Sequence, residues 1–127
     1  MQKGNANNKY KFAVLGAGHG GTAMAGHLSL LGFDVSLYNR GEERIRAIRE
    51  RKGIEILSNS DNVPHGFAEL KVVTSNIAEA IYGRDVIMVV LPATGHRFIA
   101  EQLVPHLVDN QIIVLNPGRT GGALEVL

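Results

Sequence analysis

The chain lacks cysteine altogether, and its charges nearly balance. Without cysteine it can form neither disulfides nor thiolate metal sites, and this fits a reducing cytosol, so we expect a cytoplasmic protein. A formal net charge of +1 argues against a nucleic-acid partner, which normally requires a strongly basic face. The five histidines are scattered without the spacing of a metal site, so we expect no bound metal.

Long apolar runs are missing as well. No segment approaches the roughly 18 apolar residues that span a bilayer, and no apolar signal segment opens the chain, so neither a membrane partner nor export is expected. Residues 1–9 are polar, which predicts a disordered tail. Hydrophobic residues make up 45% of the 127 residues, enough for the core of one domain, which we place at residues 10–127.

Short apolar runs alternate with amphipathic segments along this domain. We predict strands at 10–15, 33–38, 71–74, 85–91 and 111–115, helices at 22–31, 42–52, 76–81 and 95–108, irregular short strands within 54–73, and the start of a helix at 121–127. This alternation predicts βαβ units and therefore an α/β, Rossmann-type fold: a doubly wound parallel sheet with helices on both faces. The run 85–91 is the most apolar and predicts a central strand buried on both faces. Within the helix at 42–52, Glu42 and Arg46 are spaced to pair.

A glycine cluster lies between the first strand and the first helix. Its residues are Gly16, Ala17, Gly18, His19, Gly20 and Gly21. They fit G-x-G-x-x-G, which in this context indicates a loop that binds the pyrophosphate of a dinucleotide. Gly16 would permit the tight turn, Gly18 would let the backbone approach the pyrophosphate, and Gly21 would let the helix pack closely on the strand. His19 stands at a variable position, so we assign it a backbone role beside the phosphates. A glycine-rich turn without a ligand is the weaker interpretation.

The residues after the second strand bear on which cofactor is held. An acidic side chain there binds the ribose 2′-hydroxyl of NAD, whereas an arginine accommodates the 2′-phosphate of NADP. Asn39 carries no charge that would repel a phosphate, and Arg40 offers a fork of donors for it, with Arg44 one helical turn further on. The pair therefore favours NADP. NAD stays open, because Glu42 and Glu43 lie close and could serve a 2′-hydroxyl or simply favour the helix start.

Two further strand ends belong near the nicotinamide. Leu91, Pro92 and Ala93 follow the fourth strand, and Asn116 opens a turn after the fifth. Ligands of doubly wound sheets lie outside the carboxyl ends of the strands, at the switch point, so these residues are candidate cofactor contacts. Tight turns alone explain the prolines equally well. His96 begins the helix after the fourth strand, where a surface or capping role fits at least as well as catalysis, and the catalytic residues stay unknown.

Three segments together resemble a known family. They are KFAVLGAGHGGTAMAGHLSLLGFDVSLYNR, VVLPATGH and LNPGRTGGALE, and they are similar to the amino-terminal domain of the opine dehydrogenases, the octopine/nopaline dehydrogenase family. The resemblance covers about residues 10–127. LNPGRTGGALE is its most specific part, since it separates this family from ketopantoate reductases and glycerol-3-phosphate dehydrogenases.

The resemblance implies a two-domain enzyme that reductively condenses an amino acid with an α-keto acid, using NAD(P)H. It places the phosphate loop at Gly16, Gly18 and Gly21, the ribose-specificity pair at Asn39 and Arg40, and nicotinamide contacts at Pro92 and Ala93. The family's catalytic residues, a histidine included, lie in a helical second domain. We therefore expect a truncated coenzyme domain that is inactive alone. The Asn39–Arg40 pair departs from members that carry an acidic residue there.

Other functions remain open from the residues alone. A ketopantoate-reductase-like or 6-phosphogluconate-dehydrogenase-like enzyme is the second candidate, and a non-catalytic NAD(P)-sensing module is the third. The sequence stops within what should be a helix, at 121–127, and this favours the enzyme, because a self-contained sensor should complete that helix. An isolated coenzyme domain should also leave an apolar, partly exposed face towards the substrate cleft. A homodimer is one way in which such a face would be covered.

Overall fold

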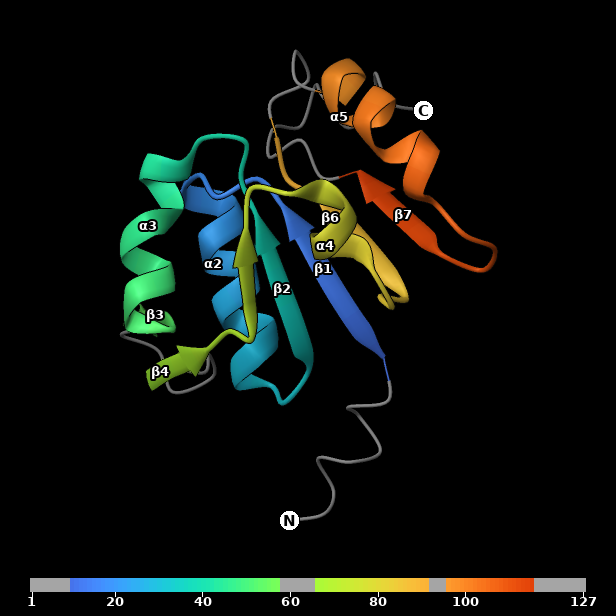
Figure 1. Cartoon of the computed structure of the whole chain (residues 1–127). Coiled ribbons are helices and arrows are strands. Elements are labelled where there is room, and N and C mark those ends of the chain that lie inside the picture. Colours follow the sequence, from blue (N-terminus) through green and yellow to red (C-terminus); the bar gives the residue numbers. More distant parts are fainter. Residues whose placement is uncertain (1–9, 58–65, 92–95, 116–127) are drawn as a thin grey trace.

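Five parallel strands form the main sheet of the computed structural model, which describes residues 10–57, 66–91 and 96–115 (Figure 1). The strands are β1 (Lys11–Leu15), β2 (Asp34–Tyr38), β5 (Val72–Thr74), β6 (Val86–Val89) and β7 (Ile112–Leu115). Their order is β5-β2-β1-β6-β7. The chain thus moves outward from β1 in one direction and then returns to build the other side, as a doubly wound sheet does. The predicted fold class is confirmed.

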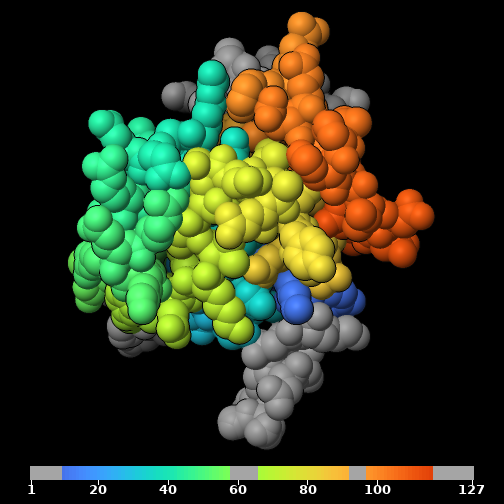
Figure 2. Space-filling view, viewed as in Figure 1, coloured from blue at the N-terminus to red at the C-terminus, as the bar shows by residue number. Residues whose placement is uncertain are grey.

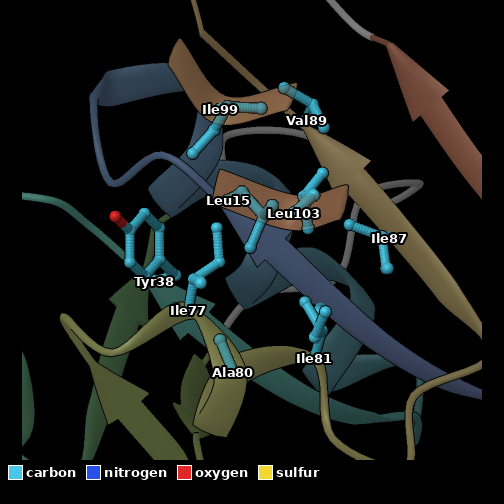
Figure 3. Close-up of a cluster of buried hydrophobic side chains, with 10 residues drawn as sticks. Leu15, Tyr38, Ile77, Ala80, Ile81, Ile87, Val89, Ile99 and Leu103 are labelled. Atoms are coloured by element: carbon cyan, nitrogen blue, oxygen red, sulfur yellow. The ribbon is translucent and has the colours of Figure 1, made fainter. Parts of the chain in front are cut away.

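Helices cover both faces of the sheet. They are α2 (His19–Leu30), α3 (Glu42–Arg51), α4 (Ile77–Ile81) and α5 (His96–Leu103), the last continuing into a 3₁₀ turn, η2 (Val104–His106). Because successive strand residues point to opposite faces, β1 contributes to two separate cores. Val14 packs with residues of α2 and α3, while Leu15 packs with residues of α4 and α5 (Figure 3).

The strand buried on both faces is β1 rather than β6. Ala13, Val14 and Leu15 have no exposed surface, because helices lie over both faces of this strand. In β6, which pairs with β1 and β7, one face is buried, whereas Val86 and Met88 on the other face are only half-buried. The prediction for the run 85–91 was therefore right about an internal strand and wrong about complete burial.

Two local features differ from the sequence prediction. The first helix begins at His19 and not at residue 22, so it includes the second half of the glycine cluster. The segment 54–73 contains an antiparallel pair, β3 (Gly53–Ile56) and β4 (Gly66–Glu69), which lies against α2. Pro105 ends the regular part of the last helix, and the chain continues as the 3₁₀ turn.

Several predictions fall outside the described residues. These are the polar tail at 1–9, the loop residues Pro92 and Ala93, the turn that begins at Asn116, and the helix at 121–127. Within the part of the chain that the structure describes, no helix is both long enough and apolar enough to cross a membrane.

Candidate functional site

The glycine loop turns sharply between β1 and α2, and two of its glycines are required by space. Gly16 has φ +115°, and a Cβ built on it would lie 2.4 Å from the carbonyl oxygen of Val90. A Cβ on Gly21 would lie 1.7 Å from the carbonyl oxygen of Gly16. Neither position can hold a larger residue unless the backbone moves, so the loop keeps α2 directly against the end of the sheet, as predicted for these two glycines.

Gly18 differs from the other two, since a Cβ on it would meet nothing within 4 Å. It is the N-cap residue of α2, with φ −73°, and no side chain caps the helix there. The first turn of α2 also carries no acidic residue, and His19 and Gly20 are exposed. Open space therefore lies in front of backbone N–H groups at the positive end of a helix dipole, and this arrangement suits a phosphate.

Asn39 holds the glycine loop in place. Its Oδ1 accepts a hydrogen bond from the backbone N–H of Ala17 at 2.9 Å, and its Nδ2 donates to the carbonyl of Gly41 at 3.0 Å. The sequence predicted a ribose contact at this position and missed the support of the loop. The amide of Asn39 spans two loops, because it offers one acceptor and two donors.

Arg40 is exposed, and its guanidinium lies over an aromatic ring. The Cζ atom is 4.3 Å from the ring centroid of Phe98, which belongs to α5. Phe98 is half-buried and packs against the core beneath α4 and α5. Beside Arg40, Tyr38 is buried, and burial raises the pKa of its hydroxyl despite the nearby positive charge. Arg40 thus connects the end of β2 with the helix that follows β6.

Glu42 is engaged away from the predicted ribose position. Its carboxylate accepts hydrogen bonds from Arg49 at 2.9 and 3.2 Å and another from the hydroxyl of Ser75. These hydrogen bonds lower the pKa of Glu42 to about 2. The predicted pairing with Arg46 is wrong. Arg49 is the partner because its Nε also donates to the carbonyl of Val73 in β5, and this holds the side chain beside Glu42.

A shallow cleft of about 430 Å³ lies beside the glycine loop. Ala17, Gly18 and His19 border it on one side, and Arg44 borders it from α3. Its remaining lining comes from Thr22, Ala23, Ile48, Ile54, Glu55 and Ile56. The structure thus brings Arg44 to one cleft with the start of α2, whereas Asn39 and Arg40 are not among the residues that line it, so the predicted role of Arg44 beside Arg40 stays a prediction.

The end of β6 meets the glycine loop. The N–H of Val90 donates to the carbonyl of Leu15 at 2.9 Å, and the side chain of Leu91 comes close to Gly16. Leu91, a predicted cofactor contact, therefore lies next to the loop. Pro92, Ala93 and Asn116 lie outside the described residues, as does the side chain of His96, so the nicotinamide end of the site stays a prediction.

Comparison with known proteins gives this arrangement a family. The model of the NAD-dependent glycerol-3-phosphate dehydrogenase N-terminus matches residues 11–117. The stretch LNPGRTGGALE, which was expected to separate the chain from that group, begins within the matched residues and continues beyond them. The other two segments that resemble the opine dehydrogenases lie within the matched residues, so the family match and that resemblance share most of the chain.

Two curated relatives represent both groups. An opine dehydrogenase from Arthrobacter sp. (strain 1C) is 40% identical over 114 residues, which are 90% of this chain and 31% of that protein. A glycerol-3-phosphate dehydrogenase [NAD(P)+] from Thermoanaerobacter sp. (strain X514) is 29% identical over 110 residues, or 84% of this chain and 30% of that protein. The chain thus spans less than a third of the length of these relatives. The similarity to opine dehydrogenases is confirmed.

Solved structures agree on the fold. Octopine dehydrogenase with NADH and L-arginine superposes with a TM-score of 0.75 at 23% identity, over 90% of this chain and 30% of that one. Yersinopine dehydrogenase with NADP+ gives 0.68 at 16%, over 83% and 27%. A PanE/ApbA family ketopantoate reductase from Ralstonia eutropha JMP134 gives 0.65 at 26%, over 84% and 34%. All three share the arrangement of strands and helices described above.

Proposed function

Since the chain belongs to the NAD-dependent glycerol-3-phosphate dehydrogenase N-terminus family, we propose that it is the NAD(P)-binding domain of an oxidoreductase that resembles the opine dehydrogenases. The observation that carries the proposal is the uncapped start of α2 at Gly18, where the backbone faces open space. Relatives of both groups are dehydrogenases. The 40% identity to an opine dehydrogenase favours that group over the glycerol-3-phosphate dehydrogenase at 29%.

In this proposal, different residues of the site bind different parts of the cofactor. The pyrophosphate lies against the N–H groups of Gly18, His19 and Gly20, while Gly16, Ala17 and Gly21 shape the loop. The adenosine ribose lies at the end of β2, where Asn39 fixes the backbone and Arg40 provides positive charge. The nicotinamide lies towards the carboxyl ends of β6 and β7, at Leu91, Pro92, Ala93 and Asn116.

In this proposal the whole enzyme joins an amino acid to an α-keto acid and reduces the product. Octopine dehydrogenase has been solved with NADH and L-arginine and with NADH and pyruvate, which are substrates of these two classes. The bound cofactor supplies the hydride. The 127 residues bind and orient it, while the proton donor and the substrate pocket that such a reduction needs belong to the remainder of a longer enzyme.

The preferred cofactor is NADPH. Arg40 follows β2 at the predicted ribose position, Arg44 comes one helical turn further on, and the carboxylate of Glu42 is bound to Arg49 and Ser75. Positive charge at that position, with the carboxylate of Glu42 already engaged, suits a 2′-phosphate better than a ribose diol. Replacing Arg40 by alanine should weaken NADPH binding by about one to two decades, the value of a charge-assisted hydrogen bond, and NADH binding much less.

The phosphate loop is tested by the substitution Gly18→Val. Its side chain enters open space rather than the protein, so the fold should survive while the pyrophosphate is excluded. Calorimetry with NADPH should show affinity lost, and circular dichroism should stay that of wild type. Gly21→Ala is the contrasting variant, because its methyl group meets the backbone of Gly16 and should unfold the loop. Unchanged NADPH affinity in Gly18→Val would contradict the assignment.

Catalysis is tested by a turnover assay, in which we expect no activity. With pyruvate and a panel of amino acids, the 127-residue chain should bind NADPH without oxidising it, as followed by absorbance. Turnover would place a proton donor within these residues and make His96 a catalytic candidate again.

A further inference from the structure

We infer that Phe98 is a positioning residue for Arg40, and that this cation–π pair sets the preference for a 2′-phosphorylated cofactor. The inference rests on the proposed function, because it assigns a specificity determinant to that site. The G-x-G-x-x-G loop and the residues after β2 are where sequence reasoning looks for cofactor specificity. Phe98 lies in neither place. It comes from α5, on the far side of the switch between β1 and β6.

The backbone that carries Arg40 is fixed. The N–H of Asn39 donates to the carbonyl of Thr74 at 3.2 Å, and the side chain of Asn39 binds Ala17 and Gly41 on either side of the site. The residue before Arg40 is therefore held by three hydrogen bonds. What remains free is the long side chain of Arg40, which is exposed.

Phe98 holds the other end of that side chain. The 4.3 Å between the guanidinium Cζ and the ring centroid is within the range of a cation–π contact. The backbone of α5 that carries the ring is well packed, because Ile99 and Leu103, which lie one helical turn apart, are each only 2% exposed. With both ends held, less rotamer freedom is lost when Arg40 meets a ligand, so binding is stronger.

The contact with Phe98 leaves the N–H donors of Arg40 available for a ligand. The Cζ atom of Arg40 lies over the ring of Phe98, and the five N–H donors of a guanidinium lie in its own plane. The guanidinium of Arg40 donates no hydrogen bond to any residue in the described ranges 10–57, 66–91 and 96–115. A planar fork that is held over an aromatic ring and keeps its N–H donors unused suits a doubly charged phosphate, which accepts two parallel hydrogen bonds.

The acidic residue beside Arg40 does not compete for it. Glu42 is two residues away, but its two carboxylate oxygens accept hydrogen bonds from Arg49 and Ser75. The low pKa of Glu42, about 2, reflects the same contacts. Arg40 thus lies over the ring of Phe98, and Glu42 does not form an ion pair with it because Glu42 is bound to Arg49 and Ser75. Both arrangements preserve its charge for a ligand.

The test compares 2′,5′-ADP with 5′-AMP, and NADPH with NADH, by calorimetry on the 127-residue chain. Phe98→Leu removes the aromatic face and keeps an apolar side chain, so the preference for the 2′-phosphorylated member of each pair should fall about three- to tenfold. Phe98→Tyr should restore the preference. In the double variant with Arg40→Ala, Phe98→Leu should cause no further loss, because the two residues act through one contact.

Phe67→Leu is the matched control, since Phe67 is an exposed phenylalanine on β4. It should change neither preference, and thermal unfolding should show that each variant is folded. An unchanged preference in Phe98→Leu would overturn the inference. So would tighter binding of both cofactors by that variant, because Arg40 would then have to leave the ring to admit adenine. If wild type binds neither cofactor, the proposed function itself fails.

Discussion

The two sides of the sheet differ in how far their side chains are buried. On the β2 side, Leu37 has no exposed surface, and helices α2 and α4 pack against β2. On the β7 side, the four apolar residues Ile112–Leu115 are between 37% and 58% exposed. In Figure 2, residues 96–115, coloured orange to red, stand out at one side of the molecule.

This difference follows the division of the proposed site. Asn39 and Arg40 lie at the end of the enclosed β2, so the proposed adenosine site is on the well-packed side of the sheet. The β7 side instead borders an open apolar groove of about 400 Å³ between α5 and β7, lined by Ile99, Leu103, Ile113 and Leu115 among others. Within the described residues, the β2 side of the sheet is thus covered on both faces, whereas the β7 side is covered only in part.

The largest expected effect is the difference in stability loss between a substitution on the β2 side and one on the β7 side. Leu37→Ala leaves a cavity in the enclosed core and should lower the free energy of unfolding by about 2–5 kcal/mol. Ile112→Ala, at a residue that is 58% exposed, should lower it by less than about 1 kcal/mol. Urea unfolding followed by circular dichroism measures both values. Equal losses would contradict the difference in packing.

A smaller effect is expected where the enclosed side meets the site. Asn39→Ala leaves the buried N–H of Ala17 without its acceptor and should lower the free energy of unfolding by about 1–3 kcal/mol. The same variant should weaken NADPH binding, because the glycine loop loses its support. Asn39→Asp keeps the acceptor and should lose less stability, while its negative charge shifts the preference from NADPH towards NADH. Wild-type stability and NADPH affinity in Asn39→Ala would show that the loop holds itself.

The open side should bind an apolar probe. A fluorescent dye that binds exposed apolar surface should give a signal with wild type, and this signal should fall when Ile113 and Leu115 are both replaced by threonine, which keeps the strand propensity. Val108→Thr is the control, since Val108 is 65% exposed but does not line the groove. A signal that survives the double substitution would place the apolar surface elsewhere.

The smallest expected effect is on how the stability of the fold depends on pH. The pKa of Glu42 is about 2 in the folded chain and that of an ordinary glutamate, about 4.3, when unfolded, so the contacts of Glu42 stabilise the fold above the higher value. That contribution is lost as the pH falls from about 4.3 to about 2. The difference in stability between wild type and Glu42→Gln should shrink over this interval. Glu43→Gln, on the same helix turn, is the control, and a difference that stays constant with pH would contradict the assignment.

Much of the fold could be predicted from the sequence, because hydrophobic periodicity and glycine positions act locally. The five parallel strands, the four helices and the glycine turn all follow from such patterns. What the sequence missed depends on residues far along the chain. Asn39 supports Ala17 across the site, and Arg49 is drawn to Glu42 because Val73 holds its Nε. The burial of β6 likewise depends on what lies over its second face.

The central claim is that the start of α2 and the end of β2 hold the phosphates and ribose of a dinucleotide. Backbone amide resonances of the 127-residue chain, followed by NMR as NADPH is added, test it most directly. We predict that the largest shifts occur at Gly18, His19, Gly20 and Arg40, with little change at Lys11 and Asp85 at the opposite end of β1 and β6. Shifts centred on those last two residues, or none at millimolar NADPH, would contradict the account.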